Sequence, residues 1–215
     1  MKVCTPVAAS PLASACVAES RPRVATARAR LLLVRHGQTD WNRDGRYQGR
    51  SDTALTTFGR EQALALGERL AGSGARTLIS SPLQRARETA LPIGHQLGLD
   101  LAIDERLCEL SYGDWEGFTQ AEVKARWPEA LRRWKRQPDA YPPAGGEALP
   151  IAAERIRHCL DDLAASLPSP VIVVTHSGVI RIARLLADNT ELAAFRHISV
   201  GNSDLFALDW PPRIP

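Results

Sequence analysis

The fold of this chain of 215 residues is indicated first by one stretch, Leu31-Leu32-Leu33-Val34-Arg35-His36-Gly37. A short apolar run that ends in polar residues is typical of a strand buried on both faces. Arg35 and His36 would then lie at the carboxyl end of that strand, which is the edge where α/β sheets place their ligands. Gly37 would let the backbone turn sharply and approach a ligand closely. For an isolated Arg-His-Gly, an ordinary strand end with an exposed arginine and a capping histidine is the better explanation, so the rest of the chain has to decide.

Strand and helix patterns alternate along the rest of the chain. A buried strand is expected at residues 31–35, a second strand at 77–80, a short strand at 101–103, a central strand at 171–175 and an edge strand at 204–208. Helices are expected at residues 56–70, 83–97 and 177–187, with Pro82 in a first helical turn, and over the apolar stripe from Leu149 to Leu167. Because strands separated by helices favour parallel pairing, the sequence predicts an α/β fold, a three-layer sandwich with a mostly parallel central sheet covered by helices on both faces.

Between Leu110 and Gly146 this alternation stops. The segment contains three tryptophans and a basic cluster, Arg132, Arg133, Lys135 and Arg136. A long segment without a strand and helix pattern is typical of an insertion that covers a site. We therefore expect a cap insertion of helices and loops at about residues 110–146, within a domain that spans residues 30–210.

Composition and charge narrow the class of protein. The formal net charge is +3, but residues 1–30 hold an excess of cations, so the body of the chain is close to neutral and no nucleic-acid partner is expected. No apolar stretch approaches the roughly 20 residues of a membrane span, so no membrane partner is expected either. Neither the cysteines nor the histidines have the spacing of metal ligands, which favours reduced thiols, a cytoplasmic location and neither metal nor cofactor. The oligomeric state stays open.

Residues 1–29 are rich in alanine, serine, proline and arginine. Such a composition is shared by disordered extensions and targeting segments. A disordered extension, or a start codon placed too far upstream, is favoured over an export signal because prolines interrupt the apolar segment.

Three predicted strand ends carry groups that bind anions. The first carries Arg35 and His36, the second leads through Ser80-Ser81-Pro82-Leu83-Gln84 to Arg85, and the strand at residues 171–175 leads to His176. Arg85 taken alone could be an exposed surface charge, and His176 could be a buried structural histidine. Because parallel strands emerge at one edge, however, these groups are expected to converge, and such a cluster of cations is stable around a phosphate.

Beside a phosphate, His36 could act as a nucleophile, and a nucleophilic histidine also needs a group that protonates the leaving oxygen. Glu109 is the candidate, because a carboxyl that is shielded from water beside a phosphate favours its protonated form. Glu116 and Glu147 are alternatives, although Glu116 is better explained as a loop carboxylate and Glu147 as a residue in the first turn of a helix.

Together these motifs resemble those of the histidine phosphatase superfamily, the phosphoglycerate-mutase-like proteins. The motifs that carry the resemblance follow one another in order: Arg35-His36-Gly37-Gln38-Thr39 with Asn42, Tyr47-Gln48-Gly49, Ser80-Ser81-Pro82-Leu83-Gln84-Arg85-Ala86, Glu109 with Gly113-Asp114-Trp115-Glu116-Gly117, Gly145-Gly146-Glu147, and Thr175-His176-Ser177-Gly178-Val179-Ile180-Arg181.

The resemblance implies a role for each matching residue. His36 would attack phosphorus and become a phosphohistidine, and Glu109 would act as acid and then as base. Arg35, Arg85 and His176 would hold the phosphate oxygens. Asn42, Gln48, Gly49 and Ser177 would contact the phosphate or the substrate beside it.

The resemblance leaves hydrolysis and mutase chemistry open, because both use a phosphohistidine. Phosphoglycerate mutases carry a lysine some residues after the glutamate, where this chain has Gln120, and Gly-Asn after the second histidine, where it has Ser177-Gly178. Tyr112 and Lys135-Arg136, in contrast, lie where mutases place substrate contacts. The missing lysine and asparagine favour the phosphatase branch, a metal-independent phosphomonoesterase acting on a small phosphorylated metabolite. A cofactor-dependent phosphoglycerate mutase and a non-catalytic phospho-ligand binding or scaffold protein are the alternatives.

Overall fold

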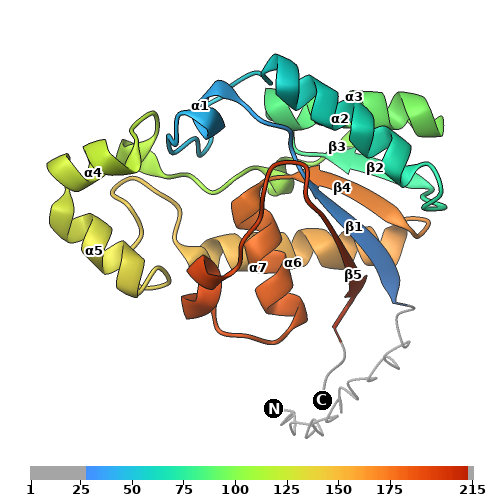
Figure 1. Cartoon of the computed structure of the whole chain (residues 1–215). Coiled ribbons are helices and arrows are strands. Elements are labelled where there is room, and N and C mark those ends of the chain that lie inside the picture. The colour runs from blue at the N-terminus through green and yellow to red at the C-terminus, as the bar shows by residue number, and fades with distance from the viewer. Residues whose placement is uncertain (1–27, 213–215) are drawn as a thin grey trace, which may run out of the picture.

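The computed structural model describes residues 28–212, so most of the extension expected at residues 1–29 lies outside it. Five strands form one sheet in the order β3-β2-β4-β1-β5 (Figure 1). These strands are β1 (Ala29–Arg35), β2 (Thr77–Ser80), β3 (Leu101–Ile103), β4 (Val171–Thr175) and β5 (Leu205–Trp210). All neighbouring strands are parallel except β5, which runs antiparallel to β1. The predicted α/β class and the mostly parallel sheet are therefore confirmed.

Helices cover both faces of this sheet. The helices are α1 (Asp40–Arg43), α2 (Thr57–Leu70), α3 (Gln84–Leu97), α4 (Gln120–Arg126), α5 (Pro128–Arg136), α6 (Leu149–Ser166) and α7 (Ser177–Ala187), with 3-10 turns η1 (Glu105–Leu107), η2 (Gly113–Trp115) and η3 (Leu192–His197). Helices α2 and α3 pack together on one face, and α6 and α7 pack together on the other (Figure 1). No helix within residues 28–212 is long and apolar enough to cross a membrane.

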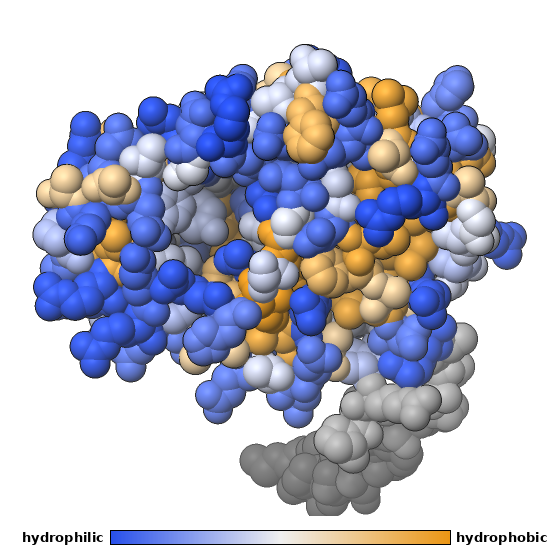
Figure 2. Space-filling model, viewed as in Figure 1, coloured by the Kyte–Doolittle hydropathy of each residue, from blue (hydrophilic) through white to orange (hydrophobic). Residues whose placement is uncertain are grey.

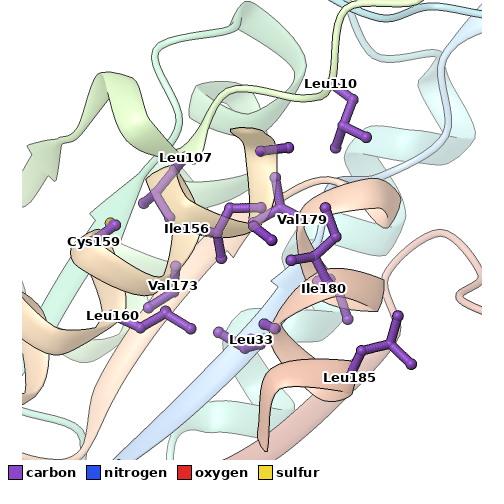
Figure 3. Close-up of a cluster of buried hydrophobic side chains, with 14 of the residues drawn as sticks. Leu33, Leu107, Leu110, Ile156, Cys159, Leu160, Val173, Val179, Ile180 and Leu185 are labelled. Carbon is purple, nitrogen blue, oxygen red and sulfur yellow. The ribbon is translucent and has the colours of Figure 1, made fainter. Parts of the chain in front are cut away.

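The apolar run of β1 explains the two-sided core. Side chains alternate between the faces of a strand, so Leu32 and Val34 join the core under α2 and α3, whereas Leu31 and Leu33 join the core under α6 and α7. Figure 3 shows Leu33 in the second of these cores, among side chains of β4, α6 and α7. Burial on both faces explains why this strand is apolar at each of residues 31–34, and each fully buried leucine contributes roughly 1.5–3 kcal/mol.

The predicted bounds of several elements differ from those in the structure. Strand β1 begins at Ala29, because that residue pairs with Trp210, and β5 accordingly extends to Trp210. The placement of Pro82 in a helical turn was wrong. Leu83 is in the extended conformation and caps α3, which begins at Gln84, so Pro82 lies before the cap.

Residues between 110 and 146 carry η2, α4 and α5, and the latter two helices lie beside the sheet rather than on it (Figure 1). Trp115 and Trp134 are buried, and their rings meet edge to face with centroids 6.3 Å apart. Trp134 also contacts Phe195 of η3, with the ring centroids 6.0 Å apart. Aromatic packing thus attaches this segment to η3, and its role as a cap over the site stays a prediction. In Figure 2 a hollow lies between the two parts.

Candidate active site

The carboxyl ends of β1, β2 and β4 bring two histidines together. The backbone N–H of His36 donates to the carbonyl of Thr175, and that of Ser81 donates to the carbonyl of Val174, each over 3.0 Å. These bonds continue the ladders of the sheet past the last paired residues. As a result His36 and His176 lie side by side, with ring centroids 5.1 Å apart, and both are buried.

The ring of His36 is held in one orientation. Its Nδ1 atom lies 2.7 Å from the carbonyl oxygen of Gly37. Because a carbonyl can only accept, Nδ1 carries the hydrogen in the neutral ring and Nε2 keeps its lone pair. Burial lowers the pKa of His36 well below its usual value, and the neighbouring cations Arg85 and Arg35 lower it further. His36 therefore stays neutral at physiological pH, as a nucleophile must.

The loop after His36 is locked against two helices. A side chain at Gly37 would meet the carbonyl oxygen of Gly59 in α2 at 2.4 Å, so this close approach requires glycine. The N–H of Gly37 donates to the hydroxyl of Thr89 over 3.0 Å, and that hydroxyl donates to the carbonyl of Arg85 over 2.7 Å. Both helices thereby fix the position of the candidate nucleophile.

Arg85 is fully buried, at 0% exposure, and is not the surface charge that its helical position would allow. Its Nη1 and Nη2 groups donate to the carbonyls of Ser51 and Gly49 over 2.8 and 2.7 Å. Arg35 similarly donates to the carbonyl of Val200 over 2.7 Å, and burial lowers its pKa to about 10.

Two buried N–H donors at this site have no acceptor within residues 28–212. These donors are the Nε atoms of Arg35 and Arg85. The Nδ1 atom of His176 is also without a partner, whereas its Nε2 atom lies 2.8 Å from the Ser81 hydroxyl. A buried unpaired polar atom costs about 1–3 kcal/mol. An anion with several oxygens would satisfy these groups together, so the cluster has the chemistry of a phosphate site.

Glu109 faces the same site and is 6% exposed. Its Oε1 atom accepts from the backbone N–H groups of Leu110 over 3.0 Å and of Gly178 over 3.1 Å. A side chain at position 178 would lie 2.4 Å from Oε1, so glycine is required there. The preceding residue, Ser177, forms the first position of α7 and leaves this contact intact. Among the three carboxylates considered, Glu109 alone has no bond to another side chain.

Both alternative carboxylates form hydrogen bonds or ion pairs with other side chains. Glu116 accepts from the backbone N–H groups of Ser51 and Tyr112 and from the Ser51 hydroxyl, and so ties two loops together. Glu147 forms a two-pronged ion pair with Arg155 over 2.7 and 2.9 Å. The expectation that Glu147 lies in a first helical turn was wrong, because α6 begins at Leu149.

The remaining predicted contact residues support the loops around the site. Asn42 and Thr39 form a reciprocal cap at the start of α1. The side-chain oxygen of Gln48 accepts from the hydroxyls of Thr39 and Thr53 over 3.0 and 2.8 Å. The Gly49 carbonyl is a partner of Arg85. Direct contact of Asn42, Gln48, Gly49 or Ser177 with a substrate stays a prediction.

The sequence-based reasoning missed Asn202. Its Nδ2 group donates to the carbonyls of His36 and Gly37 over 3.1 and 3.2 Å and to Asn42 Oδ1 over 3.0 Å. The only available signal was the segment Gly201-Asn202-Ser203-Asp204, whose composition predicts a turn before β5 and nothing about its neighbours.

Paired imidazoles, buried guanidinium groups and a carboxyl at the edge of an α/β sheet form the kind of site that transfers phosphoryl groups. The model of the histidine phosphatase superfamily (branch 1) matches residues 31–213, and the chain belongs to this family. The family membership predicted from the sequence is therefore confirmed.

Similar proteins in this family are named as phosphatases. Glucosyl-3-phosphoglycerate phosphatase of Mycobacterium tuberculosis is 40% identical over 160 residues, which cover 70% of this chain and 71% of that protein. Phosphoserine phosphatase 1 of Hydrogenobacter thermophilus is 32% identical over 175 residues, covering 81% and 83%. The structure of the mycobacterial glucosyl-3-phosphoglycerate phosphatase with VO3 superposes with a TM-score of 0.78 at 35% identity, covering 83% of this chain and 90% of that one. These relatives agree with the predicted phosphoric monoester hydrolase.

Proposed function

We propose that this protein is a metal-independent phosphomonoesterase that hydrolyses a small phosphorylated metabolite through a phosphohistidine on His36. The observation that carries the proposal is the state of the His36 ring, which is buried, neutral and fixed through Nδ1 by the Gly37 carbonyl. Its Nε2 lone pair is thereby available for attack on phosphorus.

In the first step, Nε2 of His36 forms a bond to phosphorus while the bond between phosphorus and the leaving oxygen breaks. Glu109 gives its proton to that oxygen, so an alcohol departs rather than an alkoxide. In the second step, a water molecule attacks phosphorus and gives its proton to Glu109. The bond between phosphorus and Nε2 breaks, which releases inorganic phosphate and returns His36 to its neutral form.

Positive charge for this transfer would come from Arg35, Arg85 and the His176 imidazole. The two guanidinium groups each retain a buried donor without an acceptor. Such donors are already oriented when charge develops on the phosphoryl oxygens, so little reorganisation is needed in the transition state. A divalent cation is therefore not required to neutralise the phosphate.

Hydrolysis rather than mutase activity is supported by the named relatives and by the cap. The relatives are phosphatases for glucosyl-3-phosphoglycerate and phosphoserine. Gln120, near the place where mutases carry a lysine, is exposed at the start of α4. A mutase would have to retain a second anionic group at this place, and an exposed glutamine offers it no charge.

The proposal is tested by trapping the intermediate. Mixing the protein with a 32P-labelled phosphomonoester and quenching in alkali should yield one labelled histidine, because phosphohistidine survives base and not acid. His36→Ala should abolish the label and reduce turnover to background. His158→Ala, which changes an exposed histidine of α6, serves as the control and should label normally. Labelling that persists in His36→Ala would place the nucleophile elsewhere.

A further inference from the structure

The hydroxyl group of Ser81 is buried against the ring of His176. Both residues are 0% exposed, and the Ser81 hydroxyl oxygen lies 2.8 Å from Nε2 of His176. The same oxygen accepts from the backbone N–H of Leu83, the capping residue of α3, over 3.3 Å. Ser81 therefore links His176, which caps α7, to the start of the helix that carries Arg85. The proposed hydrolysis gives this serine no role.

The main chain of Ser81 is fixed on both sides. Its N–H donates to the carbonyl of Val174 in β4 over 3.0 Å. Its carbonyl accepts from the hydroxyl of the preceding residue, Ser80, over 2.9 Å. The Ser81 hydroxyl is thus held against the His176 ring by the sheet itself, and the direction of the hydrogen bond between them depends only on where the hydrogens are.

The hydrogen count of His176 decides that direction. Burial, and then the positive charge of Arg85, lower the pKa of His176 well below its usual value, so the ring is neutral in the free protein and carries one N–H. If that hydrogen were on Nε2, it would be donated to Ser81, and the Ser81 O–H would have no acceptor within residues 28–212. With the hydrogen on Nδ1, the Ser81 O–H donates to the Nε2 lone pair and both groups are satisfied.

The thiol of Cys108 does not change this assignment. It lies close enough to the Ser81 hydroxyl for the hydroxyl to affect its pKa, but burial has the larger effect and raises that pKa. Cys108 therefore stays a thiol at physiological pH. A thiol sulfur is only a weak hydrogen-bond acceptor, so the imidazole Nε2 is the preferred acceptor for the Ser81 hydrogen.

This tautomer leaves one N–H of His176 available. Nδ1 is buried and has no partner within residues 28–212. The His176 ring lies beside the ring of His36, with the centroids 5.1 Å apart, so a phosphoryl group on His36 would be next to it. An N–H attracts phosphoryl oxygens as their negative charge grows, whereas a lone pair at the same atom would repel them.

We infer that Ser81 is a positioning residue for the proposed phosphoryl transfer, because it keeps the hydrogen of neutral His176 on Nδ1, from which it is donated to a phosphoryl oxygen. The positive charge that His176 offers is then the positive end of this N–H bond. This inference rests on the proposed function, but the tautomer itself is a property of the free protein and can be measured without substrate.

The first test measures the tautomer by NMR of the free protein with 15N-labelled histidine. A ring nitrogen that carries a hydrogen and one that does not differ widely in 15N chemical shift, and the signals of His176 are those missing from His176→Asn. The wild-type protein should show hydrogen on Nδ1, and Ser81→Ala should show hydrogen on Nε2 or a mixture of the two tautomers. Ser80→Ala is the matched control, since Ser80 is equally buried but donates to a carbonyl. It should keep the wild-type tautomer.

The second test measures turnover of p-nitrophenyl phosphate. Ser81→Ala should lower kcat by about 3- to 10-fold with a smaller change in KM, the range set by one hydrogen bond between neutral groups. Ser80→Ala should stay within about twofold of the wild-type kcat. His176→Asn removes Nε2 but keeps an amide at the position of Nδ1, so Ser81→Ala should cost less than about twofold when added to it. A serine that only holds the start of α3 through Leu83 would cost the same factor in both backgrounds.

Three outcomes would overturn the inference. They are a wild-type His176 with its hydrogen on Nε2, a Ser81→Ala variant that keeps the hydrogen on Nδ1, and an equal cost of Ser81→Ala in the wild-type and His176→Asn backgrounds. The first needs no Ser81 variant to fold. Failure of the proposed function itself looks different, because p-nitrophenyl phosphate would then not be hydrolysed by the wild-type protein, or would be hydrolysed equally well by His36→Ala, whichever tautomer His176 has.

Discussion

The substitution Glu109→Gln separates proton transfer from every other contribution of this carboxyl group. Oε1 of Glu109 accepts from Leu110 N–H over 3.0 Å and from Gly178 N–H over 3.1 Å, and an amide oxygen can accept both bonds. Only the longer contact of Oε2 with Gly178 N–H, at 3.2 Å, is lost. The side chain should therefore stay in place, at a structural cost of about 1 kcal/mol.

The kinetic cost is expected to be much larger, and to depend on the leaving group. General acid catalysis contributes about 10²- to 10⁴-fold, which corresponds to roughly 3 to 5.5 kcal/mol of transition-state free energy. Glu109→Gln should lose this factor for alkyl phosphates, whose alkoxides depart poorly without a proton. For p-nitrophenyl phosphate, whose leaving group departs as an anion, the loss should stay below about tenfold.

The assay measures kcat/KM across a series of phosphomonoesters with leaving groups of increasing acidity. Glu109→Gln should steepen the dependence of rate on leaving-group acidity relative to the wild-type protein. Glu116→Gln and Glu147→Gln are the controls. They should lower stability through the bonds to Ser51 and Arg155 while keeping the wild-type slope. Equal losses for alkyl and aryl substrates in Glu109→Gln would refute the assignment of the acid, and a steepened slope in Glu116→Gln would transfer the role to that residue.

Four further predictions follow from the same geometry. Arg85→Ala should slow the hydrolysis of alkyl and aryl substrates alike by about 10²- to 10³-fold. Arg85→Lys should not restore the rate, because an ammonium lacks the fork that donates to the Gly49 and Ser51 carbonyls. A full rescue by lysine would contradict this. Burial lowers the pKa of His36 and of His176 in the folded state, so the unfolded state binds more protons below about pH 6.5. The free energy of unfolding, measured in urea, should therefore fall by roughly 1 kcal/mol per histidine from pH 6.5 to 5.5, and His36→Asn should flatten that dependence. Asn202→Ala should reduce kcat by about tenfold with little change in KM, and Asn202→Asp should be worse because a carboxylate cannot donate to the carbonyls of His36 and Gly37; equal rates in both variants would argue against a positioning role. Excess chelator should leave the rate unchanged and vanadate should inhibit, whereas recovery of a lost rate on adding magnesium would show that a metal takes part.

Two kinds of information were already present in the local sequence. The uninterrupted apolar runs of β1 and β4 specify strands buried on both faces, because a strand with one solvated face would alternate with polar residues. Those strands lead into Arg35, His36 and His176. Once the strands are known to be parallel, chain order alone places these residues at one edge of the sheet. The ordered motifs identified the family, since each is short but their order and spacing are restrictive.

Other features of the site depend on contacts between segments that are far apart in the sequence. Whether Arg85 is a surface charge or a buried donor depends on the carbonyls of Gly49 and Ser51, which lie more than 30 positions earlier. The choice among Glu109, Glu116 and Glu147 depended on which carboxylates bind other side chains. Glu116 binds Ser51 of another loop, and Glu147 binds Arg155 of α6. Asn202 reaches His36 across more than 160 positions, and no local pattern encodes such a contact.

The physical reason for this division is the range of the interactions involved. Backbone conformation and burial depend on side-chain periodicity within a few residues, so the sequence by itself determined the strands, the helices and the edge at which the chemistry is placed. Hydrogen bonds and charge interactions act over a few ångströms in space regardless of chain separation. Only the tertiary structure therefore decided which cations are buried and which carboxyl has no side-chain partner.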